Sequence, residues 1–352
     1  MLLDERTRAI ANRVDEVLAV LPPELAEHAS AETHACVVEL KTAPHARVGD
    51  VAAELARLRP AVDRVLRDEL GLCVAAAGTH PLAIRSQVAT TGDARHSTVS
   101  KTMGALAHRE PTMALHVHVA LPDGDTAVRA LDGLRDDLPL LLAVSANSPF
   151  WRRSDSGFAS MRSPIFSMFP RVGIARRFGT YARYVRATER MLRSVAVPDP
   201  SFLWWDARLQ PRLGTIEVRI MDSQSRVADV AALAAFVQCL VRRHAEVPGY
   251  GGTEPEVLAE NRFLAARDGM GAVFIGGSTG RKAASEALSE RLESCEPYVD
   301  ALGCRRELAD IAALAADPGH ERQRRIAARD GLDGLVASLV RAFVPSRRVV
   351  AA

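Results

Sequence analysis

The chain has 352 residues and a mass of 38.0 kDa, and its 45 basic and 43 acidic residues give a formal net charge of +2. This balance produces no overall positive field, so we expect no nucleic-acid partner, and a hydrophobic fraction of 48% excludes a largely disordered chain. No run of about 18 apolar residues occurs, and the first residues lack the apolar core of a signal peptide. We therefore expect no membrane segment and a cytoplasmic location.

The first part of the chain alternates helical and strand patterns. Residues 10–21 predict a helix that ends at Pro22, and residues 33–40 predict the first complete strand. Residues 48–70 carry apolar side chains at helical spacing, which predicts a helix against the sheet with a kink or break at Pro60.

The middle of the chain continues this pattern. Residues 72–77 predict a buried strand, and residues 113–120 predict a second one after a polar loop. From residue 123 the spacing predicts a helix that Pro139 should end. The short apolar run at residues 140–144 is then expected to be a buried strand.

Residues 147–179 are the least regular part, rich in Ser, Gly, Pro, Arg and Phe, and a loop of this length is typical of a lid or binding loop. Residues 181–195 predict a helix. Residues 202–209 and 215–221 predict two strands joined by a hairpin loop. Everything from residue 227 onward looks helical.

These elements predict an α+β fold with helices packed on one face of an antiparallel sheet. No internal repeat or low-complexity linker divides the chain, so we expect a single domain over residues 1–352. Residues 1–225 would form its sheet-bearing catalytic part and residues 226–345 a mostly helical part.

Polar groups recur on one face of four expected strand segments. Alternate residues of a strand point to the same face, so these groups can converge where the sheet is not covered by helices. They are Glu39, His116 with His118, Asp206 with Arg208, and Glu217 with Arg219. Such a set can hold a metal-bound phosphate, which indicates a reaction on a phosphoryl group.

The segment around Glu217 gives the clearest pattern. Ile216, Val218 and Ile220 should face the core, while Glu217 and Arg219 share the other face. A carboxylate can bind a hard divalent cation, and a guanidinium can neutralise phosphate oxygens. The alternative is an ordinary exposed ion pair on a strand.

His116 and His118 also share a face. Two histidines at this spacing can bind zinc, manganese or iron, or can hydrogen-bond a phosphate. A zinc hydrolase that uses both is a further alternative, but no HExxH motif supplies additional ligands. Glu39, at a strand end, is either a solvated residue or a third group on this face.

No phosphate-binding loop of the form GxxxxGK[ST] is present, and residues 276–280 are expected to be a surface turn. A bound nucleotide would therefore be held by the sheet and a metal ion. Thr79, within Gly78-Thr79-His80, either contributes a polar contact or belongs to a simple turn.

At this point the motifs resemble a known family. Residues 204–219 look like the WWDxRxxPRxxTxEVR signature of bacterial carboxylate-amine ligases in the glutamate-cysteine ligase type 2 family. The resemblance runs in order along the chain to about residue 345. It also covers residues 38–42, 77–81, 116–119, 146–151, 157–162, 260–262 and 266–269.

The resemblance implies a glutamine synthetase-like fold, in which a curved antiparallel sheet holds ATP and Mg²⁺ or Mn²⁺. Members of the family activate a carboxylic acid as an acyl phosphate, which an amine then attacks to form an amide. Glutamate and cysteine are the usual substrates, and the activity is often weak. A homodimer is implied as well. The site residues implied are Glu39, His118 and Glu217 for metal, Arg219 for the γ-phosphate, Arg162 as a clamp, and Asn147, Arg208, Thr79 and His116 for nucleotide.

One departure from the family concerns the start of the chain. Family members usually have a strand reading roughly GVEEE before the segment matched by residues 2–4, and those glutamates would add to the metal site. Without them, the cation would have fewer carboxylate ligands in this chain. Either the start codon has been placed too late or the protein is a weakened ligase. The alternative function is a noncatalytic relative that binds a nucleotide or an amino acid.

Overall fold

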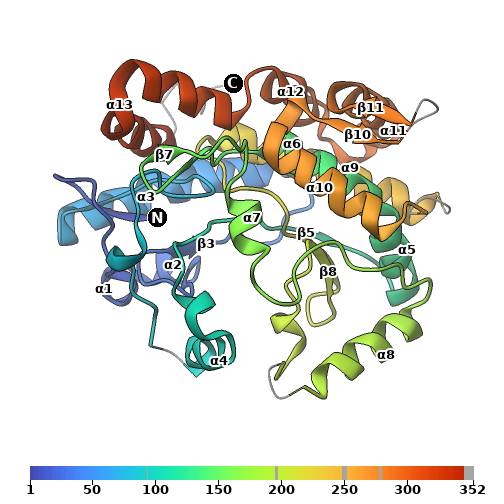
Figure 1. The fold of residues 1–352 in the computed structure, drawn as a ribbon, viewed down its shortest axis with the longest axis horizontal. Helices are drawn as coiled ribbons and strands as arrows, with labels where there is room; N and C mark the ends of the chain where they lie inside the picture. Colours follow the sequence, from blue (N-terminus) through green and yellow to red (C-terminus); the bar gives the residue numbers. More distant parts are fainter. Residues whose placement is uncertain (93, 195–196, 248–251, 277–279, 345–352) are drawn as a thin grey trace.

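The computed structural model describes residues 1–92, 94–194, 197–247, 252–276 and 280–344. Its N-terminal region places short strands around one long helix (Figure 1). The elements are β1 (Leu2–Asp4), α1 (Val14–Val20), α2 (Pro23–Ala26), β2 (Ala29–Ala31), β3 (Val38–Leu40), α3 (Val48–Leu70) and β4 (Leu72–Val74).

The predicted helix at residues 48–70 is confirmed, but it is not broken at Pro60. Proline removes one hydrogen bond from a helix interior. Leu58, Val62 and Leu66 are fully buried on α3, and this packing offsets the missing bond. The strand expected at residues 33–40 is shorter than predicted, since only its end forms β3.

The central region contains the strands and helices that build the candidate site. They are α4 (Ala94–Met103), β5 (Val117–Ala120), α5 (Gly124–Leu134), α6 (Leu138–Ser145), β6 (Phe150–Trp151), β7 (Ser154–Asp155), α7 (Arg162–Phe166), α8 (Tyr181–Leu192), β8 (Ala207–Gln210) and β9 (Thr215–Val218). Short 3₁₀ turns occur at Arg85–Gln87, Gly104–His108, Arg135–Asp137 and Pro200–Phe202. Strands β8 and β9 are the predicted hairpin, and α8 confirms the helix expected at residues 181–195.

Strands β5, β9 and β8 form a three-stranded antiparallel sheet in that order. Its helix-covered face is apolar: Ile216 and Val218 are fully buried in the same core cluster as Val128 of α5 and Leu233 of α9 (Val227–Glu246). The alternation predicted for residues 215–220 is therefore confirmed. The opposite face is left for the polar side chains.

The strand expected at residues 140–144 is wrong, because this run lies within helix α6. Pro139 occupies the first turn of α6, where its missing N–H costs no hydrogen bond and its fixed φ suits the helix. The proline therefore starts a helix instead of ending one. Every residue of α6 is buried, so its sequence has no polar face to reveal a helical period.

The C-terminal region is mainly helical, as expected. It consists of α9 (Val227–Glu246), α10 (Pro255–Asp268), a 3₁₀ turn (Gly269–Gly271), β10 (Val273–Ile275), β11 (Arg281–Ala283), α11 (Ala284–Leu302), α12 (Arg305–Ala316) and α13 (Gly319–Phe343). The hairpin of β10 and β11 departs from the all-helical prediction. Part of the turn expected at residues 276–280 lies outside the described residues.

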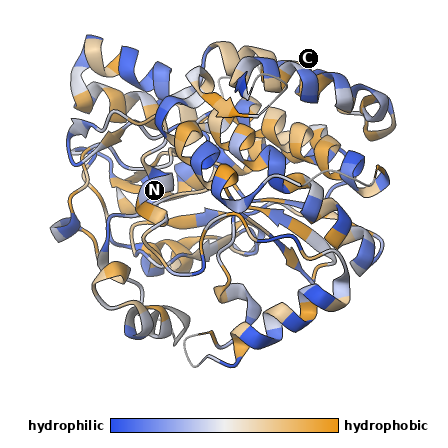
Figure 2. Cartoon of the chain, turned by 45° about the vertical axis from the view of Figure 1, so that its right-hand side comes forward, coloured by the Kyte–Doolittle hydropathy of each residue, from blue (hydrophilic) through white to orange (hydrophobic). Residues whose placement is uncertain are grey.

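One hydrophobic core joins the two parts of the chain. Its largest cluster includes Ile216 of β9, Leu233 of α9 and Ile311 of α12. In Figure 2 the helices at the centre are mostly hydrophobic, whereas the outer helices alternate between hydrophobic and hydrophilic residues. None of the described helices combines the length and apolar composition needed to cross a membrane.

The α+β class is confirmed in its coarse form, as helices combined with small antiparallel sheets. The described strands do not hydrogen-bond into one curved sheet. Strand β3, which carries Glu39, pairs with β2, whereas the other expected site strands form the sheet of β5, β9 and β8. Glu39 and this sheet therefore meet through side chains and not through a shared ladder.

Gly78 provides a test of packing near the end of β9. A Cβ atom at this position would lie 2.7 Å from Cγ of Asp222 and 2.8 Å from Oγ of Ser148. We expect Gly78→Ala to lower the free energy of unfolding by about 1–3 kcal/mol, because the buried neighbours must shift. Urea unfolding measures this change. Gly271→Ala is the control, since a Cβ atom there would have no neighbour within 4 Å, and an equal loss there would contradict the prediction.

Candidate active site

Polar side chains from β5, β8 and β9 meet on the sheet face that the helices leave open. His118 pairs with Glu217 across one side of β9, and Arg208 pairs with Glu217 across the other. These three residues line a cleft of about 1410 Å³. Glu39, His116, Arg162 and Arg219 also line it. The structure thus brings together seven of the ten candidate site residues named from the sequence.

Glu217 is the centre of this group, and its side chain is only 3% exposed. Its Oε2 accepts hydrogen bonds from Nε of Arg208 at 2.8 Å and from Nε2 of Gln210 at 2.7 Å. Its Oε1 accepts one from Nη1 of Arg219. Burial raises the pKa of Glu217, but Arg219 and Arg208 lower it by more, so the net pKa lies well below its ordinary value. The carboxylate is therefore charged at neutral pH.

The two histidines lie beside this carboxylate. Nδ1 of His116 is 3.7 Å from Oε1 of Glu217 and 3.8 Å from Oε1 of Glu39, and Nε2 of His118 is 4.0 Å from Oε1 of Glu217. Burial lowers the pKa of both histidines, and Arg219 lowers that of His116 further. Both imidazoles are therefore neutral at neutral pH, and a neutral imidazole can bind a metal ion or accept a hydrogen bond through one ring nitrogen.

Glu39 reaches the cleft from the end of β3. Its Oε2 accepts a hydrogen bond from Oγ of Ser30 at 3.0 Å. Burial raises the pKa of Glu39, and the neighbouring Glu32 raises it further. An added positive charge would therefore stabilise the ionised form of this carboxylate.

The side chain of Arg208 is hydrogen-bonded to other groups of the protein. Besides Glu217 it donates from Nη1 to the carbonyl oxygens of Ser201 at 2.7 Å and Leu203 at 2.8 Å, and it is 5% exposed. The sequence analysis missed Gln210, although it follows Arg208 by two residues and shares its strand face. Alternation along β8 was the signal that could have found it.

Arg162, the first residue of α7, is 4% exposed. Its Nη1 donates to the carbonyl oxygen of Ile220 and its Nη2 to that of Arg219, both at 3.0 Å. Burial lowers the pKa of Arg162 to about 10, so it remains charged at neutral pH. The side chain thus lies at the cleft wall with two of its nitrogens bound to the end of β9.

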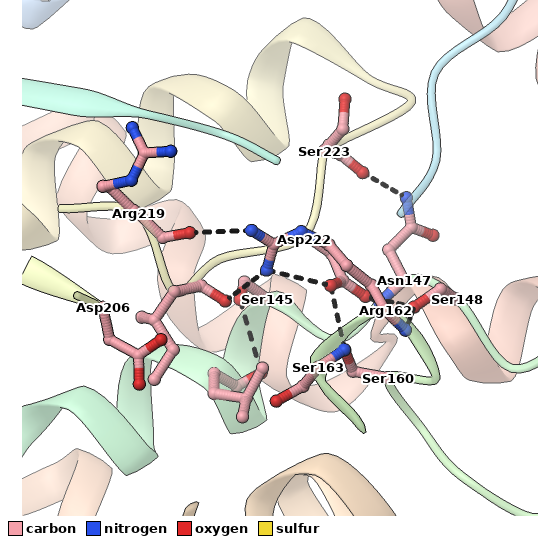
Figure 3. Close-up of polar contacts among 12 residues, drawn as sticks. Ser145, Asn147, Ser148, Ser160, Arg162, Ser163, Asp206, Arg219, Asp222 and Ser223 are labelled. Carbon is pink, nitrogen blue, oxygen red and sulfur yellow. Dashed lines mark hydrogen bonds and ion pairs between the residues drawn. The ribbon is translucent and has the colours of Figure 1, made fainter. Parts of the chain in front are cut away.

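Three predicted residues lie away from the cleft lining. Asn147 donates from its backbone amide to Oδ2 of Asp222 and from Nδ2 to the carbonyl oxygen of Ser223, both at 2.8 Å (Figure 3). Thr79 donates to the carbonyl oxygen of Phe150 at 2.9 Å. Asp206, expected beside Arg208, instead accepts a hydrogen bond from Nε of Arg262 at 2.6 Å. All three are buried and hold the fold, so the proposed site omits them.

The comparison with known families decides the class of protein. The model of glutamate-cysteine ligase family 2 matches residues 2–342. The chain belongs to this family. It is 38% identical to the "Putative glutamate--cysteine ligase 2-3" of Rubrobacter xylanophilus over 94% of this chain and 91% of the relative. It is 34% identical to the "Putative glutamate--cysteine ligase 2" of Clavibacter sepedonicus over 98% and 92%. The prediction of a ligase is confirmed.

Among solved structures, the fold is similar to that of a bifunctional glutathione synthetase from Pasteurella multocida, with a TM-score of 0.66. The sequences are 14% identical, so the likeness concerns the fold alone. The match covers 90% of this chain but 48% of the synthetase chain, so this family member spans about half the length of that protein. The family match gives no support to the metal hydrolase or to the noncatalytic relative.

The carboxylate and imidazole groups of the cleft fit part of the coordination shell of a metal ion. Among the described residues, no three His, Cys, Asp or Glu side chains are arranged to hold a metal ion by themselves. Both oxygens of Glu217 already accept hydrogen bonds. Oε2 of Glu39 is bonded to Ser30 and Nδ1 of His118 to Thr215, which leaves Oε1 of Glu39 and Nε2 of His118 as the atoms of these two residues that can bind an ion in the cleft. Mg²⁺ is commonly held by one or two carboxylates together with substrate phosphates, so these residues fit an ion that phosphate oxygens also bind.

His80, next to Thr79, gives a pH-dependent prediction. It is 3% exposed, and burial lowers its pKa from 6.5 to about 4. Below pH 6.5 the unfolded chain takes up a proton that the folded chain does not, so stability is complete above that pH and falls towards pH 4. This difference is worth roughly 3 kcal/mol. We expect His80→Gln to flatten the decline between pH 6.5 and 4 in urea unfolding; an unchanged slope would contradict the assignment.

Proposed function

We propose that this family member is an ATP-dependent carboxylate-amine ligase that activates a carboxylic acid as an acyl phosphate and joins it to an amine. Glutamate and cysteine are the pair to test first. The observation that carries the proposal is the cleft in which Glu217 is held between Arg219 and Arg208, with Glu39, His116 and His118 beside it. Fixed cations of this kind stabilise charge on transferring phosphoryl oxygens.

In this proposal a carboxylate oxygen of the acid attacks the γ-phosphorus of ATP, and ADP leaves. The amine nitrogen then attacks the acyl carbon, inorganic phosphate leaves, and the amine gives up a proton. Arg219 neutralises the phosphoryl oxygens, because its guanidinium already lies at the cleft lining next to Glu217 and His116. No covalent nucleophile from the protein is needed.

Arg208 and Gln210 take a supporting role in the proposed site. Their side-chain donors already bind Oε2 of Glu217, so they orient this carboxylate and leave nucleotide contact to Arg219 and His116. Arg162 bounds the cleft at the end of β9. A lid was expected at residues 147–179. Buried hydrogen bonds to Asp222 hold Asn147, Ser148 and Ser160 in place, so these positions do not belong to the moving part of such a lid.

Magnesium or manganese would supply positive charge to the phosphate oxygens, and Glu39, His118 and Glu217 would hold it. Glu39 and His118 support this assignment because they face the cleft as an oxygen and a nitrogen donor. The cytoplasmic location and the homodimer stay predictions.

Phosphate release from ATP, measured with a panel of carboxylic acids and amines, tests the proposal. We expect ADP and an amide in equal amounts for at least one pair, with glutamate and cysteine first in the panel. ATP binding without turnover for every pair would overturn the ligase proposal and favour the noncatalytic alternative. Tightly bound zinc with ATP-independent hydrolysis would favour the metal hydrolase.

Two substitutions test the roles of Glu217 and Arg219. We expect Glu217→Gln to reduce kcat by about 100-fold, because it removes the carboxylate that orders both arginines. We expect Arg219→Lys to reduce kcat as well, since a point charge cannot reproduce the planar fork of a guanidinium. Steady-state ADP release measures both. Glu110→Gln is the control, because Glu110 is also 3% exposed and paired with an arginine, Arg152, and neither residue lines the cleft. Wild-type kinetics in Glu217→Gln or in Arg219→Lys would remove that residue from the site.

His118 tests the metal assignment. We expect His118→Ala to raise the half-saturating Mn²⁺ concentration by about 10-fold or more, because a neutral nitrogen donor is lost. Electron paramagnetic resonance of Mn²⁺ with a non-hydrolysable ATP analogue measures binding without turnover. The control is His28→Ala, at a histidine whose Nδ1 lies 3.0 Å from the carbonyl oxygen of Lys41 and which does not line the cleft. Equal Mn²⁺ affinity in both variants would remove His118 from the metal site.

A further inference from the structure

Asp222 is a fully buried carboxylate just beyond the end of β9. Its Oδ2 accepts hydrogen bonds from the backbone amide of Asn147 at 2.8 Å and from Oγ of Ser148 at 2.6 Å. Its Oδ1 accepts one from Oγ of Ser160 at 2.9 Å. Figure 3 shows these groups converging on Asp222 from segments that are far apart in the sequence. The carboxylate thus joins the end of β9 to the start and the end of residues 147–160.

Arg162 completes this connection from α7. Its Nη1 lies 3.9 Å from Oδ1 of Asp222, so the two buried charges compensate each other. The same guanidinium donates from Nη1 and Nη2 to the carbonyl oxygens of Ile220 and Arg219, both at 3.0 Å. In Figure 3 the carbonyl group of Arg219 points toward the guanidinium of Arg162, while the Arg219 side chain points away.

The backbone of Arg219 is therefore held on both sides. Its carbonyl accepts from Arg162, and its amide donates to the carbonyl oxygen of Asp206 at 2.8 Å. A side chain whose backbone is fixed in this way reaches the cleft in a restricted set of positions. Its guanidinium meets Oε1 of Glu217 there.

We propose that Asp222 and Arg162 are positioning residues for the ligation reaction, because together they hold the backbone of Arg219 where its guanidinium can meet the transferring phosphoryl group. This inference rests on the proposed function and deepens it. Asp222 fixes the segment that carries Arg162, and Arg162 fixes the carbonyl groups of Arg219 and Ile220. Neither side chain needs to touch the substrate.

The chain offers a matched control in Asp132 of α5. This carboxylate is 4% exposed and accepts hydrogen bonds from the backbone amides of Phe178 at 2.9 Å and Gly179 at 2.7 Å. Nε of Arg177 lies 3.9 Å from it. Asp132 therefore resembles Asp222 in its burial, in accepting from a backbone amide and in having an arginine nearby, and neither carboxylate lines the cleft. The difference is that the partners of Asp132 lie at residues 177–179 and do not hold the backbone of Arg219. A purely structural role predicts the same outcome for both carboxylates.

Steady-state kinetics separates the two roles. We expect Asp222→Asn to lower kcat per folded protein by about 100-fold, the size expected when a reacting group is misplaced by about 1 Å. KM for ATP should change far less, since the charge of Arg219 remains. Asp132→Asn should lower Tm but leave kcat per folded protein at the wild-type value. Equal kcat in the two folded variants would overturn the positioning role.

Arg162→Lys provides a second variant if Asp222→Asn does not fold. Lysine keeps the positive charge at the cleft wall but cannot make two parallel donations to two carbonyl groups. Positioning predicts a loss of kcat of at least 10-fold for this variant, whereas a role through charge alone predicts wild-type kcat. Wild-type kcat would therefore overturn the inference.

Crystal structures of the wild type and of Arg162→Lys keep this test separate from the test of function. Absence of turnover in the wild type with every acid and amine would reject the proposed function. In that case the position of Arg219 still decides the inference. Loss of the Arg219–Glu217 contact in the variant supports positioning, and an unchanged contact overturns it.

Discussion

The pairing of Glu217 with Arg208 and Arg219 is the contact on which the cleft depends. A buried carboxylate without partners is strongly destabilising, and two guanidiniums beside it remove that cost only if their own positions are fixed. Arg208 is fixed by the carbonyl oxygens of Ser201 and Leu203. Arg219 is fixed through its backbone by Arg162 and by the carbonyl oxygen of Asp206. The charged groups of the cleft are therefore held in place by contacts within the protein.

This order follows from strand register, and for that reason much of it could be predicted. Side chains two residues apart on a strand share a face, so Ile216 and Val218 had to face the core if Glu217 and Arg219 faced the cleft. The hairpin between β8 and β9 then sets Arg208 opposite Glu217. The main helices and the polar face of this sheet were accessible from sequence because their periods are regular.

Other features depended on contacts between distant segments and could not be read from a local pattern. Residues 140–144 are buried on all sides within α6, so they show no period that separates a helix from a strand. Asn147 and Thr79 are polar residues whose partners within the protein are Asp222, Ser223 and Phe150, which lie far from them in the sequence. Sequence shows that a side chain can donate a hydrogen bond, but only the fold shows which acceptor it meets.

The same cluster explains why metal and nucleotide should bind together in the proposed enzyme. An ion that bound alone would compete with Arg219 and Arg208 for the oxygens of Glu217, leaving guanidinium charge uncompensated near the cleft. Phosphate oxygens that arrive with the ion supply Arg219 with a new partner and complete the metal shell at the same time. In the proposed enzyme, the metal ion would therefore raise the affinity for the nucleotide. The nucleotide would raise the affinity for the ion by the same factor, because a coupling free energy between two binding sites is reciprocal. In the proposed enzyme, the pairing that holds Glu217 would thus also favour the metal-bound nucleotide over either component alone.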